Sequence, residues 1–158
     1  MRAIIAIDPG KGGGIAIYNG RRKSLDGGIH NKLEVFKMPQ TPKDLYESLH
    51  TTFQQDTVVY LEKVHAMPRN GSISAFKLGN NLGQLEMAIT ALGCRLIYVT
   101  PQKWMKHFSL TKTNKTETPV QHKNKIKAFA QQRYPNIKVT LAISDALALL
   151  EYAKEKEL

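Results

Sequence analysis

Apolar residues fall in short runs along this chain, separated by glycine, proline and charged residues. Two of these runs, 3–7 and 15–18, flank the glycine-rich segment 9–14. Unbroken apolar runs of this length, bounded by glycines, are typical of strands buried on both faces of a sheet. They predict a hairpin in the middle of a sheet. The segment 33–38 alternates apolar and polar residues, which predicts a half-exposed third strand.

Further along the chain, short apolar runs alternate with apolar residues at helical spacing. Strands are expected at 57–61 and 95–99. Helices are expected at 42–54, 73–92, 101–107, 120–134 and 143–154. This order predicts an α/β fold with a mixed five-stranded sheet flanked by helices, in which the first strand pairs with the fourth. No internal repeat and no long linker divides the chain, so residues 1–158 are expected to form a single domain.

Three acidic residues stand where the pattern calls for apolar ones. Asp8 ends the first apolar run, Glu62 directly follows the run 58–61, and Asp145 interrupts the apolar segment 141–150. A buried carboxylate is costly unless a cation or hydrogen bonds compensate for the lost hydration. Each of the three is therefore either a satisfied structural acid or a metal ligand.

The expected topology would bring these acids together. If the first strand pairs with the fourth, Asp8 and Glu62 lie side by side, and the last helix can deliver Asp145. Three carboxylates suit Mg²⁺ or Mn²⁺, because His and Cys at zinc-like spacing are absent. Paired divalent ions can orient a water molecule, lower its pKa and stabilise the leaving oxygen in phosphodiester cleavage. A metal-dependent nuclease is the activity that this pattern favours.

The charge of the chain points to a polyanionic partner. Lys and Arg number 23 against 13 Asp and Glu, which gives a formal net charge of +10. Such an excess favours nucleic acid, because each neutralised phosphate releases condensed counterions. An ordinary solvated positive surface is the alternative.

Cysteine use and the apolar runs predict where the protein works. The single Cys94 lies inside an apolar stretch, which predicts a buried free thiol in a reducing compartment. The first apolar run is too short for a signal-peptide core, and no stretch approaches membrane-spanning length. We therefore expect a cytoplasmic protein without a membrane partner.

Five segments, in order along nearly the whole chain, resemble the motifs of the RuvC Holliday junction resolvases, particularly their phage-type members. They are IDPGKGG at 7–13, LEKVHAMP at 61–68, SAFKLGNNLG at 74–83, PQKW at 101–104 and SDALALLEY at 144–152. The resemblance implies an RNase H-like fold and a homodimer. It implies Mg²⁺-dependent nicking of two opposed strands of a four-way DNA junction, with Mn²⁺ as a substitute, in recombination, repair or the processing of branched phage DNA. Asp8, Glu62 and Asp145 would be the catalytic and metal-binding residues.

One departure from the family leaves other functions open. The family usually has a fourth acid, sometimes His, three or four residues before the helix acid, where this chain has Ala142 and Leu141. A missing ligand would weaken one metal site. A catalytically weak or inactive junction-binding protein is therefore one alternative. Another is a related RNase H-like nuclease that acts on flaps or RNA–DNA hybrids, because the acids do not report substrate shape.

Basic residues are the candidates for DNA contacts. His65 lies where the family often has an aromatic residue near the junction's crossover, and a solvent-facing histidine is its alternative. The other candidates for nucleic-acid binding are Arg69, Lys77, Lys103, Lys112, Lys115 and Lys123. Either Lys115 or Lys123 is expected near the metals, where it would stabilise charge on the scissile phosphate. Solvated helix charges are the alternative for the lysines.

Three further features have two interpretations each. The glycine loop 10–14 could cradle a nucleotide phosphate, but it lacks the P-loop pattern, so no nucleotide cofactor is expected. Trp104 is expected in the core or as an anchor of its helix, with base stacking as the alternative. The apolar side chains of the long helix could serve either the core or a dimer contact, and they are Phe76, Leu82, Leu85 and Ile89.

Overall fold

A computed structural model describes residues 3–23, 29–53, 55–65 and 71–158. Its strands form one mixed five-stranded sheet in the order β3-β2-β1-β4-β5. The strands are β1 (Ala3–Asp8), β2 (Gly14–Lys23), β3 (Ile29–Lys37), β4 (Val58–Glu62) and β5 (Arg95–Val99). β2 pairs antiparallel with β1 and β3, whereas β1, β4 and β5 run parallel. The predicted sheet, including the pairing of the first strand with the fourth, is confirmed.

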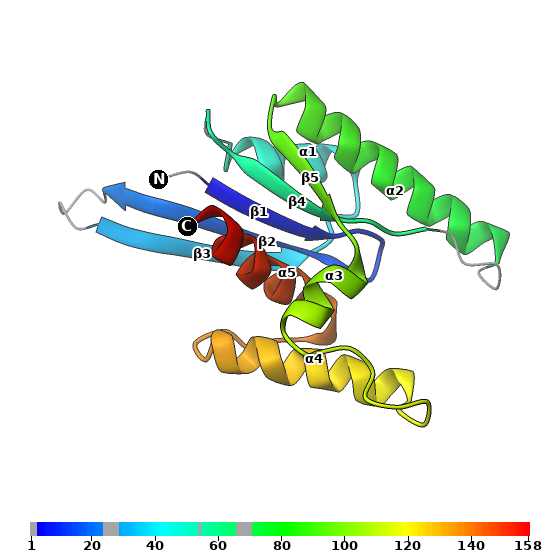
Figure 1. The fold of residues 1–158 in the computed structure, drawn as a ribbon. Coiled ribbons are helices and arrows are strands. Elements are labelled where there is room, and N and C mark those ends of the chain that lie inside the picture. The colour runs from blue at the N-terminus through cyan, green and yellow to red at the C-terminus, as the bar shows by residue number, and fades with distance from the viewer. Residues whose placement is uncertain (1–2, 24–28, 54, 66–70) are drawn as a thin grey trace.

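Helices cover both faces of this sheet. They are α1 (Pro42–His50), α2 (Ser72–Ala91), α3 (Pro101–His107), α4 (Pro119–Arg133) and α5 (Leu141–Glu157). In Figure 1, α1 and α2 lie on one side of the sheet, and α5, α3 and α4 lie on the other. The N-terminal ends of α2 and α4 extend past the same edge of the sheet, the one at which β1 ends. Asp8 and Glu62, the last residues of β1 and β4, lie at that end of the strands.

The central strands are apolar throughout because both of their faces are buried. Along β1, Ile5 and Ile7 pack in the core beneath α1 and α2. Ile4 and Ala6 pack in the core beneath α5. Since side chains alternate between the faces of a strand, Asp8 continues the second series and faces the α5 side.

The helices begin where the sequence indicates and deviate mostly at their ends. Thr118 caps α4 with a capping box that also uses Gln121. α1 ends at His50, four residues before the predicted end at 54. There the hydroxyls of Thr51 and Thr52 donate to the carbonyls of Glu47 and Ser48, which competes with continued helix.

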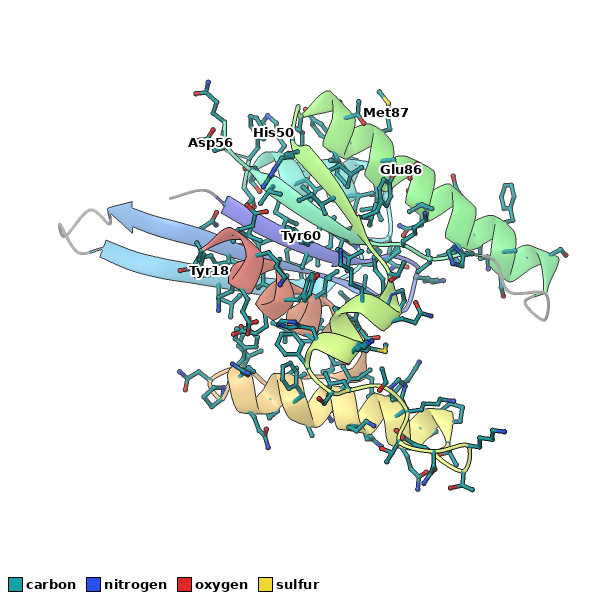
Figure 2. All side chains as sticks on the ribbon, in the orientation of Figure 1. Tyr18, His50, Asp56, Tyr60, Glu86 and Met87 are labelled. Carbon is teal, nitrogen blue, oxygen red and sulfur yellow. The ribbon has the colours of Figure 1, made fainter. Side chains whose placement is uncertain are left out.

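The far end of α5 is fastened to the sheet. Glu157 accepts hydrogen bonds from Tyr60 Oη at 2.8 Å and from Arg95 Nη2 at 2.6 and 2.7 Å. Tyr60 lies on β4 beneath the helix (Figure 2). α5 is therefore held on the sheet at both ends, because its first turn packs against β2.

Two smaller expectations have an outcome. Cys94 is a free thiol but is only partly buried, because it precedes β5 instead of lying within it. None of the helices in the described ranges is long and apolar enough to cross a membrane.

Candidate active site

Asp8 and Glu62 are neighbours at the carboxyl ends of two parallel strands. β1 and β4 pair in a register that sets Ile7 beside Leu61, so the next step sets Asp8 beside Glu62. Both side chains point to the α5 face, and they are joined by a hydrogen bond. Two carboxylates can make such a bond only if one of them carries a proton. The structure therefore places an acid pair at the edge of the sheet.

The surroundings of this pair oppose its ionisation. Burial raises the pKa of Asp8 well above its ordinary value, and the charges of Glu62 and Asp145 raise it further. Burial also raises the pKa of Glu62, while hydrogen bonds from Trp104 and Asp8 limit the rise. The two carboxyl groups consequently titrate as a coupled pair.

Trp104 holds Glu62 in place. Its indole Nε1 donates to Glu62 Oε1 at 3.0 Å, and the side chain is fully buried. α3 begins at Pro101, so Trp104 lies in its first turn, directly beneath the pair. Sequence reasoning placed Trp104 in the core but missed this contact. The signal was available, because a buried tryptophan needs an acceptor for its N–H.

Asp145 approaches the pair from α5. Ser144 Oγ donates to Asp145 Oδ1 at 3.0 Å. Burial raises the pKa of Asp145, and the hydrogen bond from Ser144 and the charges of Lys123 and His122 partly offset this. Asp145 in turn raises the pKa of both Asp8 and Glu62, so all three acids lie within electrostatic reach.

Gly14 allows α5 to come this close. A Cβ atom at Gly14 would lie 2.8 Å from the carbonyl oxygen of Ala142 and 3.0 Å from that of Phe36. The first distance is shorter than Cβ atoms show in proteins and the second is tighter than most of their contacts, and both neighbours are backbone atoms that cannot swing aside. The glycine therefore sets how closely the first turn of α5 approaches β2, and with it the place of Asp145.

The three acids do not all lie close enough together to bind one metal ion. Within the described part of the chain, no three His, Cys, Asp or Glu side chains converge tightly enough to hold a metal ion. Asp8 and Glu62 touch, whereas Asp145 acts on them through its charge. The predicted single cup of three acids is thus present as a contacting pair with a third acid nearby.

The donor set nevertheless fits a divalent cation. All three groups are oxygen donors, which Mg²⁺ and Mn²⁺ prefer. Burial disfavours the ionised forms of Asp8 and Glu62, and a bound cation would compensate for their lost hydration. Asp145 would have to reorient its side chain to join the pair.

Comparison with known proteins adds evidence on the fold. No protein-family model and no curated protein matches the sequence. RuvC from Thermus thermophilus matches the structure with a TM-score of 0.58 at 18% identity, covering 98% of this chain and 96% of that one. The same protein in complex with a Holliday junction substrate gives 0.60 at 18% identity, covering 99% and 98%. The Fowlpox virus resolvase in complex with substrate Holliday junction DNA gives 0.50 at 16% identity, covering 97% and 99%.

This chain has the RuvC fold. The RNase H-like architecture expected from the sequence motifs is thereby confirmed. In this RuvC-like fold the acid pair occupies the carboxyl ends of the two central parallel strands, and parallel sheets commonly bind ligands at that edge.

Where a fourth acid is expected, the RuvC-like chain presents other groups. Ala142 lies one helical turn before Asp145 and so shares its side of α5, and Leu141 is 48% exposed. From α4, His122 and Lys123 face Asp145, and Lys123 also acts on Asp8. Basic groups therefore border the acids on the α4 side.

The other predicted DNA-binding residues lie on several elements around this edge. Lys123 is close to the acids, whereas Lys115 is exposed in the segment between α3 and α4, so only Lys123 meets the expectation of a lysine beside the acids. The side chains that are also exposed are those of His65, Lys77, Lys103 and Lys112. Arg69 lies outside the described residues.

Proposed function

We propose that this chain is a metal-dependent endonuclease that resolves four-way DNA junctions by paired, symmetric nicks. The observation that carries the proposal is the hydrogen-bonded pair of Asp8 and Glu62, with Asp145 beside it, at the carboxyl edge of a RuvC-like sheet. The net charge of +10 suits a DNA substrate. We further propose that residues 1–158 act as one nuclease domain. It would work in the cytoplasm, in recombination, repair or the processing of branched phage DNA.

Each residue of the site has a defined part in this proposal. Asp8, Glu62 and Asp145 would hold the metal, and Trp104 would keep Glu62 oriented toward it. A bound Mg²⁺, or Mn²⁺ as a substitute, would activate a water molecule and stabilise charge on the phosphate. The ammonium group of Lys123, exposed beside Asp8 and Asp145, would contact the scissile phosphate and favour the charge that develops there.

The remaining basic residues would bind the DNA backbone without reading its sequence. Phosphate contacts fix the position of a nucleic acid on a protein and carry most of the salt dependence. The residues to which we assign this part are His65, Arg69, Lys103, Lys112 and Lys115.

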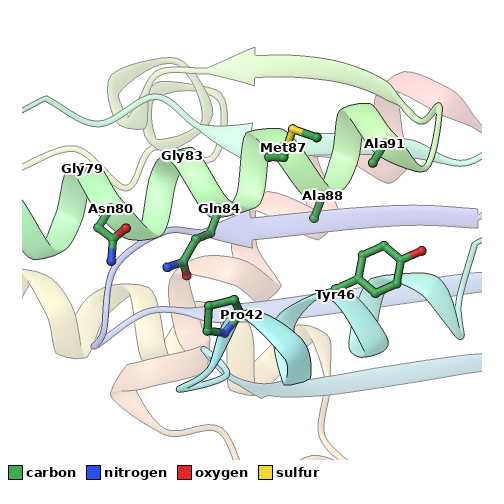
Figure 3. Close-up of a pocket in the computed structure, with 9 residues that line it drawn as sticks. All are labelled: Pro42, Tyr46, Gly79, Asn80, Gly83, Gln84, Met87, Ala88 and Ala91. Carbon is green, nitrogen blue, oxygen red and sulfur yellow. The ribbon is translucent and has the colours of Figure 1, made fainter.

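We also propose that the active form is a homodimer that uses the outer face of α2. Ile73, Phe76 and Met87 are 70%, 76% and 67% exposed on this helix, whereas Leu85 and Ile89 are buried in the core. Beside them, a groove of about 600 Å³ separates α1 from α2, lined by Tyr46 and Met87 among others (Figure 3). Two copies joined here would present two acid sites to two opposed strands of a junction.

A cleavage assay tests the proposed activity. The unmodified protein, incubated with a synthetic four-way junction and Mg²⁺, should give symmetric nicks in opposed strands. Asp8→Asn should bind the junction without cutting it. Asp56→Asn is the matched control, because Asp56 is exposed at the opposite end of β4 (Figure 2). The proposal fails if the unmodified protein shows no Mg²⁺-dependent cleavage.

A second candidate function, junction binding without catalysis, is favoured by the absence of an acid at position 142. Ala142→Asp would restore a carboxylate on the side of α5 that carries Asp145. If cleavage appears only in this variant, the natural chain is a binding protein. Equal cleavage before and after the change removes this candidate.

The preferred substrate is a separate question, because a flap or an RNA–DNA hybrid also presents phosphodiesters to the same acids. Competition between labelled four-way junction and unlabelled junction, flap, hybrid and linear duplex would rank them. Our proposal expects the junction to compete best.

A further inference from the structure

A small polar depression lies beside the acid site, on the α2 side of the sheet. It has a volume of about 180 Å³. We call it the polar notch, and the side chains that define it are Lys11, Gln40, Lys77, Asn80, Asn81 and Gln84. They come from the turn after β1, the link between β3 and α1, and the first half of α2. Three separate segments thus converge on one hollow.

The turn that carries Lys11 is fixed to α2. The backbone N–H of Gly10 donates to Asn81 Oδ1 at 2.8 Å, and the N–H of Gly13 donates to the Gly10 carbonyl at 3.0 Å. Gly10 has a φ of 103°, which other residues adopt only with strain. On the opposite wall, Gln40 Nε2 donates to the Met38 carbonyl at 2.9 Å. The notch is therefore a built feature of the fold.

The chemistry of the polar notch suits an anion. Lys11 and Lys77 are both exposed, and neither has a carboxylate partner within the described residues. No acidic residue lines the notch, and the amide of Asn81, whose oxygen accepts from Gly10, adds the hydrogen-bond donors of its NH2 group. Its volume is below the roughly 300–1,000 Å³ of sites that enclose drug-sized ligands. A single phosphate group, with several acceptor oxygens, matches both the size and the donors.

The position of the notch relates it to the acids. Lys11 follows Asp8 by three residues, in the turn that leaves β1, so one wall of the notch begins at the end of the strand that carries Asp8. Asp8 faces α5, whereas Lys77 lies on α2, which covers the other face of the sheet. Lys123 and the notch consequently flank the acids from opposite sides. A DNA strand lying across the acids would run from α4 around the sheet edge to α2.

We propose that the polar notch binds one backbone phosphate of the strand that is cut, on the flank of the scissile phosphate. This inference rests on the proposed function, because it takes DNA as the substrate. It assigns Lys11 and Lys77 to the same phosphate, with the amide groups fixing its orientation.

Salt dependence of binding tests this assignment. Junction affinity is measured without Mg²⁺ at several KCl concentrations for the unmodified protein, Lys11→Gln, Lys77→Gln and the double variant. The proposed homodimer carries one notch in each protomer, so loss of one phosphate contact per notch should lower the slope of log Kd against log [KCl] by about 1.8 in the double variant. Affinity at low salt should fall about 10-fold for each notch, the loss typical of a charge-assisted hydrogen bond. Two separate phosphates in each protomer would instead lower the slope by about 3.6 and overturn the shared notch.

A matched control and a modified substrate sharpen the result. Lys43→Gln changes an exposed lysine of α1 that pairs with Glu47 outside the notch, and it should leave the slope unchanged. Junctions with one uncharged methylphosphonate at each position near the cut should reveal one position that weakens the unmodified protein but not the double variant. The absence of any such position would overturn the inference.

The two proposals fail in different ways. If the unmodified protein neither prefers nor cuts a four-way junction, the proposed function is wrong and the notch loses its ligand. If it binds and cuts the junction but both notch variants behave like Lys43→Gln, only the notch assignment is wrong. Unchanged melting temperatures would show that the exposed substitutions leave the fold intact.

Discussion

At Asp8, stability and the proposed catalysis oppose each other. Burial and the charges of Glu62 and Asp145 raise the pKa of Asp8 well above its ordinary value. The retained proton stabilises the folded state at low pH, and this stabilisation is lost as the pH rises through the raised pKa. Carboxyl groups held in this way are typical of functional sites, where residues are kept at a cost to stability.

Replacing Asp8 by the isosteric neutral Asn should therefore stabilise the metal-free protein at neutral pH. We expect the melting temperature to rise by roughly 2–8 °C, the shift that about 1–2 kcal/mol produces in a chain of this length. Thermal unfolding in EDTA at pH 8 and pH 4 measures it. The gain should shrink toward pH 4, where Asp8 itself is protonated, and Asp56→Asn should show no gain. A lower melting temperature for Asp8→Asn at pH 8 would contradict the raised pKa of Asp8.

At Trp104, one hydrogen bond can be removed with little change in packing. Trp104→Phe keeps an aromatic ring in the core but deletes the N–H that binds Glu62. Groups that orient a metal ligand typically change metal affinity or activity by about 10–100-fold when they are lost. We expect a higher Mg²⁺ concentration for half-maximal cleavage. If a folded Trp104→Phe variant needs no more Mg²⁺ for half-maximal cleavage than the unmodified protein, Glu62 does not need this partner.

The sequence predicted some of these residues and not others, for physical reasons. Asp8 and Glu62 could be found because each is a lone acid at the end of an apolar run, and strand pairing sets them side by side. The need of a buried Trp104 for an acceptor could be read from the sequence, but its partner Glu62 could not, because the two residues are 42 positions apart on different elements. Lys123 could be separated from Lys115 only when the packing of α4 against α5 was known.

At the scale of elements, α5 controls the site through its contact with β2. Gly14 leaves room for the Ala142 carbonyl, as described above, and this contact places Asp145. The sequence shows a glycine-rich turn at 9–14, but it does not show which glycine meets another element. That distinction depends on how helix and sheet pack, which hydrophobic pattern alone does not specify.

Gly14→Ala should therefore damage both stability and cleavage. The added methyl group must push α5 away from β2, and forced overpacking typically costs about 1–3 kcal/mol. We expect the melting temperature to fall by roughly 2–12 °C. Gly12→Ala is the control, because a Cβ atom at Gly12 would meet nothing within 4 Å. Equal melting temperatures for the two variants would contradict the close approach.

Some boundaries of helices and strands are set by neighbouring residues in the sequence, and others by contacts with distant elements. α4 begins at Pro119, one residue before its predicted start, because its cap is encoded locally by Thr118 and Gln121. β3 begins at Ile29, four residues before the predicted 33, because pairing with β2 extends it beyond its alternating segment. Strand length depends on the partner strand, which local sequence does not record.

At the scale of the whole molecule, the outer face of α2 is the proposed dimer contact. Met87→Asp places a charge on this face, where the side chain points away from the sheet (Figure 2). We expect the variant to be monomeric in sedimentation velocity at concentrations where the unmodified chain is dimeric. It should also cut one strand at a time instead of making paired nicks.

Val120→Asp is the control for this experiment. Val120 is 66% exposed on α4, on the other side of the sheet, so the variant should remain a dimer. An unmodified chain that stays monomeric even when bound to a junction would contradict the proposed interface.

The raised pKa values of Asp8 and Glu62 also determine how metal binding depends on acidity. A divalent ion held by these groups would need their ionised forms, so metal binding should release protons into solution. Calorimetry in two buffers of different ionisation enthalpy would reveal the released proton as a difference in apparent heat. Apparent Mg²⁺ affinity should accordingly strengthen as the pH rises. Less Mg²⁺ should then be needed for strand cleavage at higher pH.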